Sequence, residues 1–269
     1  MIVDLVSPWM AAVEASDTVR ARQEFRARHA PLLDLIRQQR VPHLTELPLS
    51  DDRPSLRLIR ERATDPGTFA TLTDTVARAS AHGADGCQSV ILLPAGAGDA
   101  PAEALPGLGG TVVAFIAADP LSDADLVAIL LAIASLTRWE RVHRWSGAWN
   151  RWEAARDYPL REWIYNAGLG LHLALSVLAI EAHQAMALSR TTFARLRQQE
   201  KVLMARIDGD LDQRGTGLVM RWLVPSAPRS LRTVDGVTLP PMAGHYLAWR
   251  LVSPRVARAG LRDAMLLGA

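Results

Sequence analysis

The fold of this chain is decided by residues 111–144, which read TVVAFIAADPLSDADLVAILLAIASLTRWERVHR. Residues 111–117 are apolar and rich in β-branched side chains, and such a run predicts a short buried strand. Residues 121–144 predict a long helix, because Ser122 or Asp123 can accept hydrogen bonds from the free amide groups of its first turn. We expect the rest of the chain to be organised around this strand and this helix.

Length and composition are those of a globular protein. The chain has 269 residues, of which 49% are hydrophobic, so it has ample material for a core. We expect a helical N-terminal region over residues 1–84 and a second region over residues 85–269, packed together as one unit.

Charge and cysteine content exclude several kinds of site. The net charge is +2 and the arginines are spread along the chain without a basic block, so nucleic-acid binding is not expected. Cys87 is the single cysteine, which excludes an internal disulfide and a cysteine-based zinc site. The N-terminus lacks the features of a signal peptide, and the apolar run 169–180 is too short to span a bilayer. We therefore expect a soluble, cytoplasmic protein without a membrane partner.

The flanking sequence predicts a mainly helical α+β protein. Residues 89–94 are a further expected strand, and their closeness to residues 111–117 suggests a small antiparallel or mixed sheet packed on the helix. The other expected helices lie within residues 1–48 and over 68–81, 160–188, 191–211 and 244–267, the last broken near Pro254. The expected linkers and loops are residues 48–54, 95–110 and 225–241.

Tryptophans are concentrated after the long helix. Trp145, Trp149 and Trp152 are spaced by four and three residues, so a helix would align them on one face. Such a face is either a stripe of packed core residues or the aromatic wall of a ligand site.

Three segments, taken in order, carry a resemblance to a known family. Residues 110–139 combine the strand with the helix. Residues 160–172 read LREWIYNAGLGLH, and residues 241–252 read PMAGHYLAWRLV. This order resembles the predicted zinc-dependent peptidases of the gluzincin type, which carry His-Glu-x-x-His, an acidic ligand and a final helix at these places. The resemblance covers roughly residues 85–265 and implies a small sheet on a zincin-like helical core.

The metal ligands of that family are missing here. By position, Ile133 and Thr137 replace the two histidines, Ala134 replaces the general-base glutamate, and Ala167 replaces the third ligand. A catalytic zinc site uses three protein ligands and a water molecule. We therefore expect neither zinc peptidase activity nor a metal or other cofactor. The resemblance implies instead a cleft with an apolar floor formed by Ile133, Ala134 and Ala167.

Polar residues around the emptied cleft are the candidates for ligand binding. Thr137 can form hydrogen bonds, and Asn166 can orient a ligand. Arg138 and Arg141 can hold a carboxylate, sulfate or phosphate bidentately, although solvated arginines also cap the C-terminal ends of helices.

The final helix supplies the candidates for catalysis. His245 is suited to proton transfer, because imidazole titrates near neutral pH. Tyr246 falls where a tyrosine of the family assists the oxyanion.

Two functions follow from this interpretation. The first is a metal-free pseudo-metallopeptidase that acts as a ligand-binding or partner subunit, as a homo-oligomer or within a complex for small-molecule biosynthesis. The second is a metal-independent biosynthetic enzyme, of the lyase or transferase type, for a small anionic or amino-acid-like substrate in the same cleft.

Overall fold

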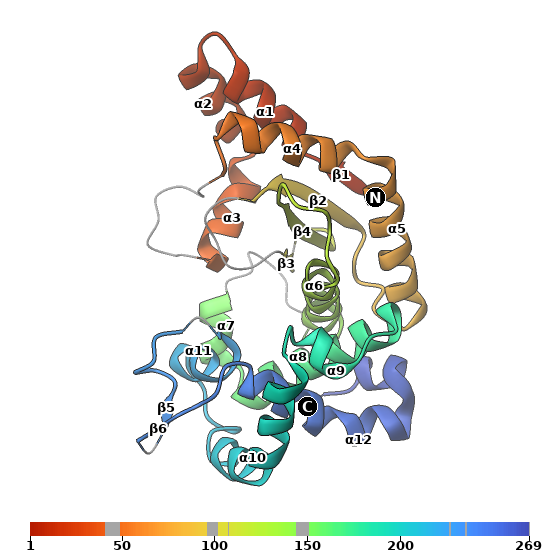
Figure 1. The fold of residues 1–269 in the computed structure, drawn as a ribbon, viewed down its shortest axis with the longest axis vertical. Coiled ribbons are helices and arrows are strands. Elements are labelled where there is room, and N and C mark those ends of the chain that lie inside the picture. The colour runs from red at the N-terminus through yellow and green to blue at the C-terminus, as the bar shows by residue number, and fades with distance from the viewer. Residues whose placement is uncertain are drawn as a thin grey trace.

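The computed structural model describes residues 1–40, 49–95, 102–106, 108–143, 151–225, 227–234 and 236–268. Most of these residues lie in helices, and the remaining elements include a small mixed sheet (Figure 1). The prediction of a mainly helical α+β protein is confirmed.

The order of elements begins with strand β1 and ends with helix α12. The strands are β1 (Ile2–Asp4), β2 (Ser89–Pro94), β3 (Ala102–Leu105), β4 (Thr111–Ile116), β5 (Thr233–Val234) and β6 (Val237–Thr238). The helices are α1 (Val6–Glu14), α2 (Thr18–Arg28), α3 (Ala30–Arg40), α4 (Arg53–Thr64), α5 (Pro66–Ala81), α6 (Asp123–Arg141), α7 (Arg151–Asp157), α8 (Leu160–Leu178), α9 (Ala182–Ala185), α10 (Arg190–Asp208), α11 (Thr216–Leu223) and α12 (Ala243–Leu266).

The main sheet has the strand order β1-β2-β4-β3. β1, β2 and β4 run parallel, whereas β3 runs antiparallel to β4, with Ala102 opposite Ala114. Every residue of β4 is buried, as expected for an inner strand covered on both faces. The mixed sheet was predicted from β2 and β4 alone.

The prediction missed β1 and β3 for a physical reason. β1 lies at the start of residues 1–48, which look helical, and its three residues are too few to show a period of two. β3 reads Ala-Glu-Ala-Leu within the expected loop, and alanine and glutamate have low strand propensity. Pairing with β4 forms this strand, so its own sequence carries little signal.

Helix α6 is the central element, as expected from its sequence. The Ser122 hydroxyl accepts from the Asp125 amide, and the Asp125 carboxylate accepts from the Ser122 amide, so the helix begins with a complete capping box. In Figure 1 this helix is seen end-on near the middle of the molecule, with the sheet above it and α8 and α12 below. Its position between these layers explains why most of its residues are buried.

Other helices differ from the predictions at their ends. The helix predicted for residues 160–188 stops at Leu178, because Ala179 takes the left-handed conformation with φ of 55°, and the short α9 follows. α12 is broken at Gly260, which has φ of 78°, and not near Pro254, so that part of the prediction is wrong. Helices α4 and α11 and the β5–β6 hairpin were not predicted.

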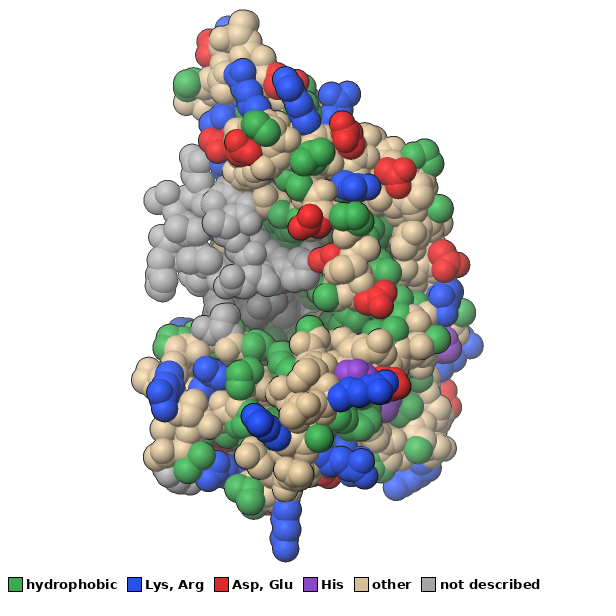
Figure 2. Space-filling model, in the orientation of Figure 1, with side chains coloured by type: hydrophobic (Ala, Val, Ile, Leu, Met, Phe, Trp, Pro, Cys, Tyr) green, Lys and Arg blue, Asp and Glu red, His purple; other side chains and the backbone are tan. Residues whose placement is uncertain are grey.

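Two further expectations concern the tryptophans after α6 and membrane-spanning segments. Trp145 and Trp149 and the side chain of Trp152 lie outside the described residues, so the choice between core stripe and ligand wall stays open. Among the helices that the structure describes, none combines the length and apolar character needed to cross a bilayer. On the face shown in Figure 2, basic side chains are distributed over both ends of the molecule and do not form a single block.

The contact between α8 and α12 yields a test of close packing. A Cβ atom added at Gly168 would overlap the carbonyl oxygen of Ala248 and lie 2.6 Å from Val252 Cγ2. We expect Gly168→Ala to lower the free energy of unfolding by about 1–3 kcal/mol, because overpacking forces the helices apart. Gly217→Ala is the control, since no atom lies within 4 Å of its added Cβ. Urea denaturation followed by circular dichroism measures both variants, and equal stability would contradict this packing.

Candidate functional site

A pocket of about 290 Å³ lies between β3, α6, α8, α11 and α12. Its volume is close to the lower limit of small-molecule sites. Apolar side chains form most of the wall, and polar residues line it from four elements, beginning with Glu103 of β3, Ser135 of α6 and Asn166 of α8. His245 of α12 completes the polar lining. The site therefore combines an apolar body with a few separate polar groups.

Helix α6 turns a different face to the pocket from the one that the sequence suggested. The pocket is lined by Ala128, Leu131, Ala132 and Ser135. Ile133 and Ala134 are fully buried elsewhere in the core, so the expectation that they form the floor is wrong. Ala167 does line the pocket, as expected.

Thr137 also lies away from the pocket. Its hydroxyl donates to the carbonyl of Ile133 at 2.9 Å and accepts from the amide of Gly86 at 3.2 Å. The side chain is fully buried, and both of its polar partners are backbone groups. Thr137 thus fixes the chain before β2 to α6 and is not placed to bind a ligand in the pocket.

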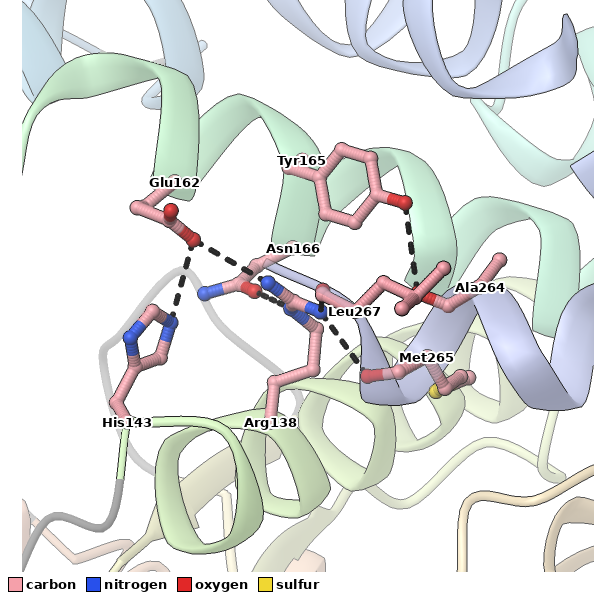
Figure 3. A network of polar contacts seen from close by, with 8 residues as sticks. All are labelled: Arg138, His143, Glu162, Tyr165, Asn166, Ala264, Met265 and Leu267. Atoms are coloured by element: carbon pink, nitrogen blue, oxygen red, sulfur yellow. Dashed lines mark hydrogen bonds and ion pairs between the residues drawn. The ribbon is translucent and has the colours of Figure 1, made fainter. Parts of the chain in front are cut away.

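Arg138 lies at the centre of a buried polar network (Figure 3). Nε donates to Oδ1 of Asn166, and Nη2 donates to Glu162 Oε2 at 3.2 Å. Nη1 donates to the carbonyls of Met265 and Leu267 at 3.0 and 2.6 Å. Burial lowers the pKa of Arg138, and the Glu162 carboxylate opposes this change.

This network changes the expected role of the two arginines. Arg138 is fully buried and its donors are directed at protein acceptors, so it joins α6, α8 and the end of α12. Arg141 is half exposed and pairs with Asp85 at 2.9 Å. Neither lines the pocket, so neither is placed to hold an anionic ligand there.

Asn166 is both part of the network and part of the pocket wall. Asn166 is 5% exposed, and its Oδ1 accepts a hydrogen bond from Arg138. Nδ2 is buried and has no hydrogen-bond partner among the described residues. Of the predicted ligand-binding residues, Asn166 is the one that the structure places at the pocket.

The two predicted catalytic residues lie on different sides of α12. His245 lines the pocket, whereas Tyr246 donates a hydrogen bond of 2.5 Å to Glu200 of α10. Tyr246 also packs on Phe193 and Trp249. Tyr246 is not among the described lining residues, so the two side chains do not serve this pocket together.

The imidazole of His245 is held in its neutral form. Although the residue keeps some exposed surface, the surrounding protein lowers its pKa to about 4, because burial disfavours the charged ring. Nδ1 is buried and lacks a hydrogen-bond partner within the described part of the chain. A neutral ring in this place can accept or donate one hydrogen bond.

The pocket has few groups that bind metals. Within the described ranges, no cluster of three or more His, Cys, Asp or Glu side chains is placed to hold a metal ion. The donor side chains of the pocket lining are Glu103 and His245, and a catalytic zinc site takes three protein ligands. The described lining therefore does not fit a zinc centre of that type.

Sequence reasoning missed the α6 face and Glu103. Ala128, Ala132 and Ser135 are small side chains spaced by four and three residues, and this spacing marks a hollow face that could have been recognised. Glu103 gave no such signal, because it lies in the strand that the sequence did not predict.

No family model, curated protein or solved structure matches the chain. The resemblance to gluzincin-type peptidases therefore remains a prediction, and function is argued from the pocket itself.

The buried network gives a prediction for stability. Arg138→Met leaves the Glu162 carboxylate and the Asn166 oxygen without their cation, and we expect it to lower the free energy of unfolding by about 3–5 kcal/mol. Arg141→Met removes an exposed ion pair, so its effect should stay within about 1 kcal/mol. Guanidinium denaturation followed by tryptophan fluorescence compares the two. Similar losses for both variants would mean that the buried network contributes no more to the free energy of unfolding than an exposed ion pair.

A second prediction concerns pH. His143 packs on Trp139 and lies 3.4 Å from Glu162, and burial lowers its pKa to about 4. In the unfolded chain the histidine has a pKa near 6.5. Between about pH 4 and pH 6.5 it is therefore protonated in the unfolded chain and neutral in the folded one. We expect stability to be complete above pH 6.5 and to fall as the pH drops toward 4. His143→Phe should make this dependence shallower in urea titrations at successive pH values and leave the part contributed by His245, and an unchanged slope would refute the assignment.

Proposed function

We propose that the protein is a metal-free binding protein that holds a small, largely apolar molecule in the pocket between β3, α6, α8, α11 and α12. The observation that carries the proposal is the cavity of about 290 Å³, whose wall is mostly apolar and includes the polar residues Glu103, Ser135, Asn166 and His245. Small-molecule sites have this composition, in which an apolar wall holds the body of the ligand and a few polar groups fix its orientation.

The pocket also supports, as a proposal, descent from a gluzincin-type peptidase. Leu131, Ala132 and Ser135 face it at positions i, i+1 and i+4, the spacing of His-Glu-x-x-His. In this register Leu131 and Ser135 stand for the histidines and Ala132 for the glutamate, two residues before the positions assigned from the sequence. Ala167 keeps its place as the substitute for the third ligand. The comparisons with known proteins add no support, so this proposal rests on the pocket geometry.

The broader role of the protein extends this proposal. We infer that it acts in the cytoplasm as a ligand-binding or partner subunit, as a homo-oligomer or within a complex for small-molecule biosynthesis. A pseudo-metallopeptidase that has lost its ligands but kept its cleft is suited to such a role.

A metal-independent enzyme is the second candidate, and His245 favours it. A neutral imidazole at the pocket can take a proton from a bound substrate, and Ser135 lies in the same lining. Tyr246, Thr137 and Arg141 lie elsewhere, so such catalysis would depend on His245 and on positioning by Asn166.

Native mass spectrometry of protein purified without chelator tests the proposal. We expect a metal-free chain that carries a small organic molecule, released on denaturation. Ala167→Phe fills the pocket and should remove this added mass, whereas Ala205→Phe, on the exposed side of α10, should retain it. An added mass that persists in Ala167→Phe places the molecule elsewhere, and one stoichiometric zinc ion would overturn the metal-free assignment.

A further inference from the structure

We propose that the protein has a second binding site, for small aromatic carboxylates, in a pocket between α9, α10 and α12. This pocket of about 220 Å³ shares none of its described lining residues with the larger pocket described above. Figure 1 shows the three helices in the lower half of the molecule. Because other residues form this second site, it can exist whether or not the proposed function of the larger pocket is correct.

Helix α10 presents one side to the second pocket. The residues of α10 that line it are Arg190, Phe193, Ala194 and Arg197. Their spacings of three, one and three residues place them along one side of the helix, with the two arginines flanking a ring and a small residue. Trp249 of α12 adds a second ring to the lining. The pocket therefore combines two exposed cationic side chains with aromatic walls.

The two rings belong to an aromatic cluster that supports them. The ring centres of Phe193 and Trp249 lie 5.7 Å apart, and both rings also pack on Tyr246, at 5.5 and 5.9 Å. Tyr246 is almost fully buried, and its hydroxyl donates a hydrogen bond to Glu200. Phe193 and Trp249 themselves keep part of their surface exposed. A fixed ring thus supports two partly exposed ones, which can pack against the ring of a ligand.

One arginine of the lining is available for an anion. Glu181 pairs with Arg190 at 3.4 Å, and Glu200 pairs with Arg250 at 2.9 Å. Within the described part of the chain, Arg197 has no carboxylate partner of its own. A guanidinium can hold a carboxylate by two parallel hydrogen bonds. Arg197 is therefore the residue that we assign to the carboxylate of the ligand.

The positive potential extends beyond Arg197. Helix α10 begins with Arg190 and has no acidic residue in its first turn, where the backbone dipoles also leave positive charge. Residues 181–269 contain 13 arginine and lysine residues against seven aspartate and glutamate residues, and such an excess attracts anions. The larger pocket contains Glu103 and no arginine or lysine among its described lining residues. An anionic ligand is therefore directed to the smaller pocket.

Four probes test the site on the full chain by isothermal titration calorimetry. Phenylacetate is an aromatic anion, phenylacetamide is its neutral analogue, 2-phenylethylamine is a cation, and cyclohexylacetate keeps the carboxylate without the aromatic ring. We expect phenylacetate to bind at least about tenfold more tightly than the amide and the amine, and about threefold more tightly than cyclohexylacetate. Phenylacetate that binds no better than any one of the other three, or not at all at millimolar concentration, would overturn the inference.

Arg197→Gln gives the matched variant, because Arg197 is exposed and its replacement should not disturb folding. We expect it to weaken phenylacetate binding at least about tenfold, to an affinity close to that of phenylacetamide. Arg195→Gln removes the same charge from an exposed position of α10 outside the pocket, and should change the affinity less than about twofold. Equal weakening in both variants would mean that only the net charge of the helix matters, which contradicts the site.

The larger pocket supplies the remaining control. Ala167→Phe, which fills that pocket, should leave phenylacetate binding unchanged. Phenylacetate binding that is lost in Ala167→Phe but retained in Arg197→Gln places the anion in the larger pocket and overturns the inference. A purified chain that carries no small molecule but ranks the four probes as expected overturns the proposed function and keeps the second site.

Discussion

The buried guanidinium of Arg138 is the interaction on which the helical half of the structure depends. Transfer of a charged group from water to a protein interior costs several kcal/mol unless acceptors surround it. Here the acceptors come from Glu162 and Asn166 of α8 and from the end of α12, so α6 can bury its arginine only when both helices are in place. The packing of α6, α8 and α12 against one another therefore depends on the Arg138 side chain. It also sets the orientation of an amide in the pocket wall.

Much of the fold could be predicted because the segments with the clearest local sequence patterns form its central elements. β2 and β4 are apolar and β-branched, and α6 begins with a complete cap. β1 and β3 were not predicted because their strand conformation depends on partners distant in sequence. The break at Gly260 was not predicted because proline is the more familiar helix breaker. Local chemistry thus indicated the centre of the fold, while its edges depended on tertiary contacts.

The site was predictable only in part. Asn166, Ala167 and His245 were associated with one cleft from the order of three segments, and the structure places all three at one pocket. The face of α6 was misassigned by two residues, since a helix that is apolar on nearly every side gives no period from which to choose a face. The separation of His245 from Tyr246 and the burial of Arg138 follow from neighbouring helices, which a single sequence does not reveal.

The close approach of helices around the pocket has a consequence for how the site can change. α8 meets α12 at Gly168, and α12 meets α11 at Gly244, where an added Cβ would overlap the carbonyl oxygen of Trp222. Separating backbones in such contact would give up their close packing, so we expect the cavity walls to keep their spacing when a ligand binds. New specificity in this scaffold would therefore arise by exchange of single side chains on fixed walls, and not through movement of a hinge.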